Sequence, residues 1–240
     1  MLALLEGLRL SKRFGGVTAL SEVSFTVEEG TIVGLIGPNG AGKTTLFNLV
    51  AGALKPDSGR VVFRGEDITG LSPNIVCRHG IARTFQVTRP FGTMTCLENV
   101  GVGVINSPRS ESDGNWRATA LHYLETVGVE DLAFTEARHL NVVQKKKLEI
   151  ARALATRPKI LMLDEVLGGL NSQEIVQAVD FIRRLRDELH LTVFWIEHVM
   201  GAIMKAAEKV IVLDQGQHLM EGTPEQVVAD SRVIHAYLGE

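Results

Sequence analysis

The order of apolar and polar positions predicts a chain that begins with strands and continues as alternating strands and helices. Residues 4–10 and 20–28 alternate on either side of a turn at Gly15, which predicts an antiparallel β lead-in. The β-branched run at 31–36 is typical of a buried parallel strand, and a helical period follows it at 44–51. The chain is therefore expected to enter its core through a strand, a turn and a helix.

The middle of the chain has a different pattern. A turn rich in proline, aspartate, serine and glycine at 56–59 precedes apolar residues 61–63 and predicts a further hairpin. From about residue 90 to residue 141 strand patterns stop and helix-forming residues dominate, so we expect helices there. Residues 107–115 are polar and contain proline and glycine, which predicts a surface loop.

After residue 144 helices alternate with short apolar strands. The strands are expected at 160–163, 192–196 and 209–213, with a helix at 172–189 between the first two. This order is typical of a parallel sheet covered by helices on both faces. Two short helices are expected in 223–238.

Charge and composition exclude several classes of function. The 240 residues carry 25 lysines and arginines against 28 aspartates and glutamates, so no overall basic field favours a nucleic acid. Cys77 and Cys96 match neither a metal-binding spacing nor a disulfide framework. We expect both to be ordinary reduced thiols.

The first five residues are apolar, but Glu6 interrupts them and no basic segment precedes them. We interpret this stretch as the lead-in to an edge strand rather than as a signal peptide. No apolar stretch approaches the roughly 18 residues that a membrane-spanning helix needs. Any attachment to a membrane is therefore expected to depend on a partner protein.

A glycine-rich loop lies between the predicted strand and helix. It fits the pattern G-x-x-x-x-G-K-[ST] with Gly37, Pro38, Asn39, Gly40, Ala41, Gly42, Lys43, Thr44 and Thr45. Its glycines let backbone N–H groups surround an anion, and the start of the helix adds a positive dipole. We expect Lys43 to reach the β- and γ-phosphates of ATP and Thr44 to bind Mg²⁺. A flexible surface loop is the alternative, and the flanking strand and helix argue against it.

Two carboxylates follow the apolar strand at 160–163. Asp164 and Glu165 stand at its C-terminal end, the edge at which ligands bind to open α/β sheets. We expect Asp164 to bind Mg²⁺ through water and Glu165 to orient or deprotonate the water that attacks ATP. Apolar residues followed by Asp-Glu are common, so this motif is specific only together with the glycine-rich loop.

With these motifs, the chain resembles the ATP-binding-cassette (ABC) ATPases over almost its whole length. Gln86 and His198 each follow a strand, as the Q-loop glutamine and the switch histidine of that family do, and Phe14 lies where the family places an aromatic ring. The resemblance implies that Gln86 senses Mg²⁺ and water. It also implies that His198 contacts the γ-phosphate and that Phe14 stacks on adenine. Taken singly, these residues could instead be a loop residue, a helix cap and a core side chain.

The resemblance also implies a fold. It predicts an α/β P-loop NTPase core with a parallel sheet, an antiparallel β subdomain and an inserted helical subdomain. We expect a single domain over 1–240, with the catalytic core in 1–89 and 142–240 and the helical subdomain in 90–141. A dinucleotide-binding dehydrogenase is excluded, because the loop carries Lys43 and lacks the dinucleotide fingerprint.

A narrower resemblance is to the ATPases of branched-chain amino-acid importers. It rests on the sequences GIARTFQ (80–86), FGTMTCLEN (91–99), LEIARAL (148–154), EGTPE (221–225) and AYLGE (236–240). It implies an energy-coupling subunit that hydrolyses ATP to drive import of these amino acids. ATPases of urea or amide importers and of lipopolysaccharide exporters belong to the same branch and remain alternatives, although GIARTFQ follows the importer pattern.

One motif departs from the family. The signature L-S-x-G-Q, through which a second subunit's nucleotide is contacted, is replaced by Leu140, Asn141, Val142, Val143 and Gln144. Asn141 keeps the ability to cap a helix and to donate a hydrogen bond. Val143 places a β-branched side chain where the backbone should approach phosphate, and it disfavours an unusual φ angle. Val166 also stands where the family has proline, which leaves the loop 166–171 less constrained.

These departures predict two unequal ATP sites. The loop at 37–45, Glu165 and His198 are complete, whereas the reciprocal site formed by Asn141 and Gln144 should bind ATP and turn it over poorly. We expect a heterodimer with a second ABC ATPase that has an intact signature, bound to transmembrane permease subunits on the cytoplasmic face of the inner or plasma membrane. A homodimer would carry the defect twice, and a local shift of the loop would remove it.

Two other functions stay open. A non-transport ABC ATPase acting on nucleic acid or ribosomes usually has long insertions or tandem cassettes, which this chain lacks. A regulatory subunit that binds ATP with little hydrolysis is favoured by the altered signature and opposed by Glu165. Phe91, Met94 and Leu97 are candidates either for a groove that receives a permease helix or for the core.

Overall fold

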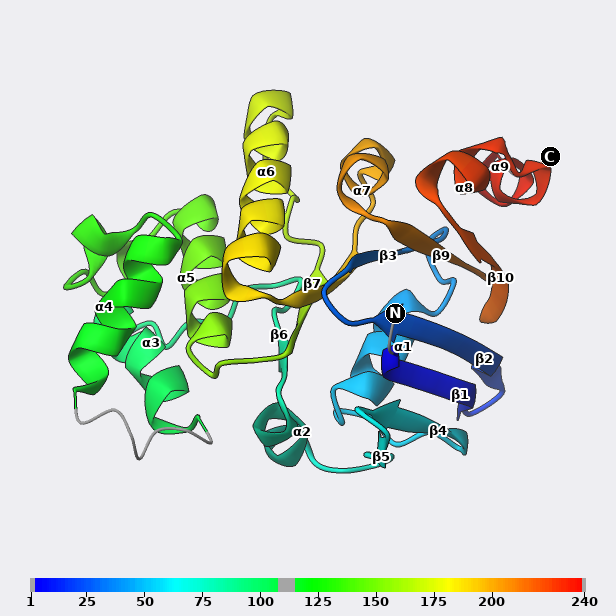
Figure 1. The fold of residues 1–240 in the computed structure, drawn as a ribbon, viewed down its shortest axis with the longest axis horizontal. Coiled ribbons are helices and arrows are strands. Elements are labelled where there is room, and N and C mark those ends of the chain that lie inside the picture. Colours follow the sequence, from blue (N-terminus) through cyan, green and yellow to red (C-terminus); the bar gives the residue numbers. More distant parts are fainter. Residues whose placement is uncertain (1–2, 108–114, 239–240) are drawn as a thin grey trace.

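The computed structural model describes residues 3–107 and 115–238, which form two sheets and surrounding helices (Figure 1). A four-stranded antiparallel sheet has the order β2-β1-β4-β5, and a six-stranded sheet has the order β10-β9-β3-β8-β7-β6. The strands are β1 (Ala3–Phe14), β2 (Val17–Glu28), β3 (Ile32–Ile36), β4 (Ser58–Phe63), β5 (Glu66–Asp67), β6 (Ile81–Arg83), β7 (Ile160–Asp164), β8 (Thr192–Ile196), β9 (Lys209–Asp214) and β10 (Gln217–Gly222). From β9 to β6 all neighbours are parallel, and β10 is antiparallel to β9.

The helices surround the sheets, and two groups of them lie at opposite ends of the molecule (Figure 1). They are α1 (Lys43–Val50), α2 (Pro73–His79), α3 (Cys96–Ile105), α4 (Trp116–Thr126), α5 (Val142–Leu154), α6 (Ser172–Leu189), α7 (Met200–Ala206), α8 (Pro224–Ala229) and α9 (Ser231–Leu238), with 3₁₀ turns at Glu130–Leu132 and Ala137–His139. In Figure 1, α3, α4 and α5 pack together at one end, and α8 and α9 lie at the other. Each helix in residues 3–107 and 115–238 is too short or too polar to cross a lipid bilayer.

The six-stranded sheet separates two apolar cores, because successive side chains on its strands point to opposite faces. On β3, Ile32 belongs to the core under the helices, whereas Val33 belongs to the core shared with the antiparallel sheet and α1. In the second core the Phe194 ring lies 5.5 Å from that of Phe25 and 4.9 Å from that of Phe47. Both faces of the sheet are covered, as expected, but one of them is covered by the antiparallel sheet together with α1 and not by helices alone.

Several predicted elements are confirmed, but the prediction that the N-terminal strand lies at the edge of its sheet is wrong. The hairpin around Gly15, the strands that follow it and the two C-terminal helices lie within a few residues of their predicted bounds. However, β1 lies between β2 and β4, because it pairs with both. Such pairing is decided by tertiary contacts that a local pattern does not contain. The predicted loop at 107–115 lies, from residue 108 to 114, outside the described residues.

Two elements were not predicted. Strand β10 follows a two-residue turn in which Gln215 and Gly216 both have positive φ, 46° and 77°. This conformation suits a tight hairpin and returns the chain antiparallel along β9. Helix α2 is bounded by Pro73 at its start and by Gly80 at its end, where φ is 107°. The glycine in the β9–β10 turn and the proline and glycine at the ends of α2 are sequence signals that would have indicated these two elements.

Candidate active site

Three loops that carry predicted site residues meet at one edge of the six-stranded sheet. Gly37 follows β3, Glu165 follows β7 and His198 comes two residues after β8. Because β3, β8 and β7 are parallel neighbours, their carboxyl ends lie at the same edge. The topology therefore brings Gly37 close to Glu165 and His198, which lie more than 100 residues later in the sequence.

A cavity of about 350 Å³ lies at this edge. Its walls are formed by Val17, Thr18, Ala19, Asn39, Gly40, Ala41, Gly42, Lys43, Thr44, Thr45, Gln86, Glu165 and His198. The structure thus places most of the glycine-rich loop around one space with Gln86, Glu165 and His198. Val17, Thr18 and Ala19 of β2 were not predicted for this site. The sequence signal that could have indicated them is their position directly after the turn at Gly15.

The conformation of the loop explains its glycine at position 42. Gly42 has a φ of 98° and directly precedes α1. A Cβ at this position would lie 2.6 Å from the carbonyl oxygen of Ala19, so a larger residue would displace β2. The first turn of α1, Lys43 to Thr45, lines the cavity, and the N-terminus of a helix is a favourable place for an anion.

Lys43 is almost fully buried, with 6% of its surface exposed. Its Nζ donates hydrogen bonds to the carbonyl oxygens of Gly37 at 2.7 Å and Pro38 at 2.9 Å. Burial lowers the pKa of Lys43, and the nearby carboxylates of Glu165 and Asp164 act in the opposite direction. The ammonium group is therefore tied to the start of the loop and attracted to the two carboxylates.

Glu165 is held through both of its carboxylate oxygens. Gln86 Nε2 donates to Oε2 at 2.6 Å, and His198 Nε2 lies 2.5 Å from Oε1. The backbone of Glu165 has a φ of 51°, a left-handed conformation that is rare for a residue with a side chain. Such conformations persist at functional sites only where the surroundings hold them. Val166 allows it, since a proline there would restrict the preceding residue to extended angles.

Asp164 lies below the cavity with 1% of its surface exposed. Its Oδ2 accepts a hydrogen bond from Arg83 Nη2 at 2.8 Å, and Arg83 Nη1 donates to Asn48 Oδ1 at 2.6 Å. Asp164 Oδ1 is buried and has no hydrogen-bond partner among the described residues. Arg83 was not predicted for the site, because nothing in a local sequence pattern shows a partner 81 residues away.

Glu197 is a second buried carboxylate that sequence reasoning missed, with 3% of its surface exposed. It accepts hydrogen bonds from the backbone N–H groups of Leu167 at 2.7 Å and His198 at 3.2 Å. Burial raises its pKa. The Glu197 side chain thus connects the loop after Glu165 to His198, which lies two residues after β8 and contacts Glu165.

Several predicted site residues do not line the cavity. Gly37 and Pro38 lie behind it, and Phe14 is 48% exposed at the end of β1 with Lys12 Nζ 5.8 Å from its ring centre. Asn141 and Gln144 lie at the start of α5, where each backbone N–H donates to the other's side chain at 2.9 Å. The predicted capping by Asn141 is confirmed.

Val143 occupies an ordinary position in the first turn of α5. It has no positive φ, so no unusual backbone angle is imposed at this position. Val143 lines a second cavity of about 670 Å³ together with Lys146, Val166 and Leu167. Lys146 Nζ donates to the carbonyl oxygens of Val166, at 3.0 Å, and Gly168. The altered signature thus lies beside the loop that follows Glu165.

This arrangement of loop, paired carboxylates, glutamine and histidine agrees with what family comparison finds. A family model described as "ABC transporter" matches residues 20–168, which is more than half of the chain. The chain belongs to the ABC transporter ATP-binding family. A second model, described as "Branched-chain amino acid ATP-binding cassette transporter", matches residues 217–240.

Relatives of this ABC ATPase match it over nearly their whole length. The high-affinity branched-chain amino acid transport ATP-binding protein BraF of Pseudomonas aeruginosa is 42% identical over 99% of this chain and 98% of its own. The corresponding protein LivG of Escherichia coli is 39% identical over 96% of both chains. These matches extend through the helical segment and the C-terminal helices.

Solved structures share the fold. An ATP-binding cassette of an ABC transporter in its ADP conformation is 33% identical, with a TM-score of 0.88 and complete coverage of both chains. A dimeric bacterial ABC transporter cassette is 26% identical, with a TM-score of 0.83 over 92% of this chain and 99% of the other. The predicted fold class and ATPase activity are confirmed, with β10 added at the edge of the sheet. ATP-binding subunits of this kind dimerise and work with permease subunits.

Proposed function

We propose that this ABC ATPase is the energy-coupling subunit of an importer for branched-chain amino acids, peripheral on the cytoplasmic face of the inner or plasma membrane. The observation that carries the proposal is the match of residues 217–240 to the branched-chain amino acid cassette model. The identity of 42% with BraF over almost the full chain supports it. Both observations favour this function over urea import or lipopolysaccharide export.

In the proposed site, the loop binds the phosphates of ATP. Residues 39–45 line the cavity and supply backbone N–H groups to the phosphates, and Lys43 reaches the β- and γ-phosphates from its place at the start of α1. Phe14 stacks on the base, for which its exposed ring is available. Residues 17–19 of β2 close the cavity on the same side.

The residues near the loop fit a Mg²⁺ ion. The buried Oδ1 of Asp164 lacks a partner among the described residues, and the Thr44 hydroxyl and the Gln86 amide supply further oxygen atoms, the ligand type that Mg²⁺ prefers. Asp164 is buried and does not line the cavity, so it would hold the ion through water. Mg²⁺ bound there would offset the negative charge of the phosphates. Arg83 holds the other carboxylate oxygen and so fixes which oxygen of Asp164 is free.

Hydrolysis depends on Glu165. Its carboxylate orients the attacking water and accepts a proton from it, while Gln86 and His198 hold the two carboxylate oxygens in place. His198, which also borders the cavity, contacts the γ-phosphate. Glu197 fixes the backbone of His198 and of the loop at Leu167, so that the two sides of this arrangement move together.

The helical segment 90–141 and the residues after Gln86 form the proposed surface for permease subunits. Phe91 is exposed and its ring lies 5.3 Å from the guanidinium of Arg152, whereas Leu97 belongs to the core. Met94 is half-buried, so of the three apolar candidates Phe91 is the one best suited to contact a permease helix. The remaining core, 1–89 and 142–240, carries the nucleotide site.

The second subunit of the proposed dimer is a different ABC ATPase with an intact signature. Asn141 and Gln144 contact the nucleotide held by that partner, and Val143 weakens this contact because it replaces glycine beside them. The same substitution favours the second candidate function, an ATP-binding regulatory subunit. The carboxylate of Glu165, which Gln86 and His198 hold in place, argues against this second function.

Transport by the intact complex tests the proposal. The chain is purified from membranes together with its co-purifying subunits and placed in vesicles that contain Mg·ATP. We expect ATP-dependent uptake of leucine, isoleucine and valine, ATPase stimulation by the permease, and a different ABC ATPase in the complex. Uptake of urea without leucine would contradict the assigned substrate. A complex with two copies of this chain would contradict the heterodimer.

A further inference from the structure

The C-terminal helix α9 contacts the glycine-rich loop from outside the cavity. The hydroxyl of Tyr237 accepts a hydrogen bond of 2.7 Å from the backbone N–H of Gly37, 200 residues earlier in the chain. Gly37 directly follows β3 and begins the loop. Tyr237 does not line the 350 Å³ cavity, so this contact is not part of the nucleotide-binding surface itself.

Gly37 lies in a buried and crowded part of the fold. Gly37 is buried, and a Cβ at this position would lie 2.1 Å from the carbonyl oxygen of Leu213 at the end of β9. Within the described residues, Tyr237 is the acceptor for this N–H. A buried backbone donor without a partner is costly, so loss of the hydroxyl is expected to change the local conformation of the loop.

The same peptide is held on its other side by Lys43. The carbonyl oxygen of Gly37 accepts from Lys43 Nζ at 2.7 Å. A chain of contacts therefore runs from Tyr237 through the backbone of Gly37 to the ammonium group of Lys43. The next part of the loop is fixed in a similar way, because the N–H of Gly216 in the β9–β10 turn donates to the carbonyl oxygen of Ala41 at 3.2 Å.

Both outer contacts come from the last 30 residues of the chain. Gly216 lies in the turn before β10 and Tyr237 lies on α9, so the β9–β10 hairpin and the C-terminal helix support the loop from the side away from the cavity. Residues 217–240 also match a separate family model, beyond the match at 20–168. Burial raises the pKa of the Tyr237 hydroxyl, which keeps it protonated and neutral.

We propose that Tyr237 is a positioning residue for nucleotide binding. Its hydroxyl fixes the Gly37 peptide, and through that peptide it fixes Lys43 and the N–H groups that surround the phosphates. The C-terminal segment is thereby part of the nucleotide site, although none of its residues up to Tyr237 lines the cavity. The proposal rests on the phosphate-binding role of the loop at 37–45.

Replacing Tyr237 by phenylalanine tests the proposal, because it removes the hydroxyl and keeps the ring. In the assembled complex we expect Tyr237→Phe to weaken Mg·ATP binding and raise its KM about tenfold, which corresponds to about 1.4 kcal/mol. We expect kcat at saturating ATP to stay within about twofold, since Glu165 and His198 are untouched. Exchange of the Gly37 amide proton, measured by NMR on the isolated chain, should become faster.

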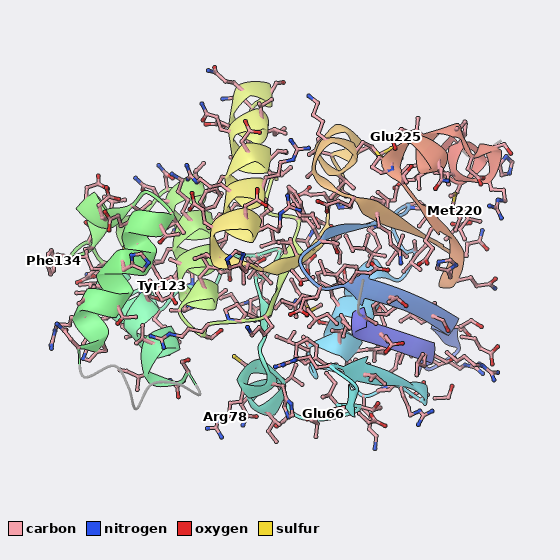
Figure 2. The ribbon with its side chains drawn as sticks, in the orientation of Figure 1. Glu66, Arg78, Tyr123, Phe134, Met220 and Glu225 are labelled. Atoms are coloured by element: carbon pink, nitrogen blue, oxygen red, sulfur yellow. The ribbon has the colours of Figure 1, made fainter. Side chains whose placement is uncertain are left out.

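Tyr123→Phe is the matched control. Tyr123 is the other tyrosine of the chain and lies on α4, at the end of the molecule opposite α8 and its labelled Glu225 (Figure 2). It should leave the affinity for Mg·ATP unchanged. Equal affinities of the two variants for Mg·ATP would overturn the proposal. It would also be overturned if Tyr237→Phe lowered only kcat or only thermal stability and left the affinity unchanged. Failure of the unmodified complex to bind ATP would instead overturn the assigned role of the loop, and the present proposal with it.

Discussion

Two regions of this chain are proposed to contact ATP, and they are held in different ways. At the glycine-rich loop, polar groups are bonded to separate elements: Lys43 to the start of the loop, and Glu165 to both Gln86 and His198. At the start of α5, the side chains of the exposed Asn141 and the half-buried Gln144 accept hydrogen bonds from each other's backbone, their only side-chain hydrogen bonds within residues 3–107 and 115–238. The first region is preorganised within one subunit. The second can act only when a nucleotide held by another subunit is brought to it.

The two regions are connected through the loop that follows Glu165. Lys146, one turn into α5, donates to the carbonyl oxygens of Val166 and Gly168. Burial lowers the pKa of Lys146, and the nearby Glu197, Glu149 and Glu165 partly offset this effect. The start of α5 is thus tied to the residue that follows Glu165, the proposed general base. A disturbance in either region is therefore expected to reach the other.

The largest effect is expected from breaking the preorganised region. Glu165→Gln removes the proton acceptor but keeps the size of the side chain, so we expect kcat to fall at least about 100-fold. Binding of Mg·ATP should persist, because the loop and Lys43 are unchanged. Glu225→Gln makes the same chemical change on the exposed surface of α8 (Figure 2) and should have no effect. Hydrolysis by Glu165→Gln at the unmodified rate would rule out this residue as the base.

The second effect tests whether the altered signature limits turnover. Val143→Gly restores the family residue beside Asn141, so we expect the ATPase rate of the assembled complex to rise about tenfold or more, toward the roughly hundredfold that one preorganised donor is worth. The rate should rise only in the complex, because the affected nucleotide belongs to the partner. An unchanged rate would mean that the contact is already complete with valine.

The glycine-rich loop, the strands before it and the paired carboxylates could be predicted from the sequence, because each depends on short-range geometry. The pattern G-x-x-x-x-G-K-[ST] specifies a backbone shape, and an apolar run ending in Asp-Glu specifies a strand with two carboxylates at its end. The N-cap of α5 was predictable for the same reason, since Asn141 and Gln144 are three residues apart.

The supporting contacts could not be predicted in this way. Arg83 reaches Asp164 across 81 residues, and Tyr237 reaches Gly37 across 200. Their partners are set by the order of strands in the sheet and by the docking of α9. The position of β1 inside its sheet has the same origin. The β9–β10 turn is different, because Gln215-Gly216 after an apolar strand is a local hairpin signal that was overlooked.

The link between the two regions can be weakened at Lys146. Lys146→Met removes two hydrogen bonds to the loop at Val166 and Gly168, so we expect the free energy of unfolding to fall by about 1–2 kcal/mol. We also expect kcat to fall several-fold, because the loop carries Glu165 at its start. Denaturant unfolding and steady-state ATPase assays measure the two effects. Lys145→Met is the control on the same helix, and an equal loss in both variants would show that Lys146 has no special connection.

The smallest effect distinguishes capping from nucleotide contact. Asn141 and Asn171 cap α5 and α6 with the same reciprocal pattern, so replacing either by alanine should lower the free energy of unfolding by about 1 kcal/mol. Only Asn141→Ala should also lower the ATPase rate of the assembled complex, because Asn141 is proposed to contact the partner's nucleotide. Denaturant unfolding of the isolated chain gives the first quantity, and turnover of the complex gives the second. If the two variants reduce turnover equally, Asn141 acts only as a helix cap, and the start of α5 contributes nothing to the partner's site beyond its fold.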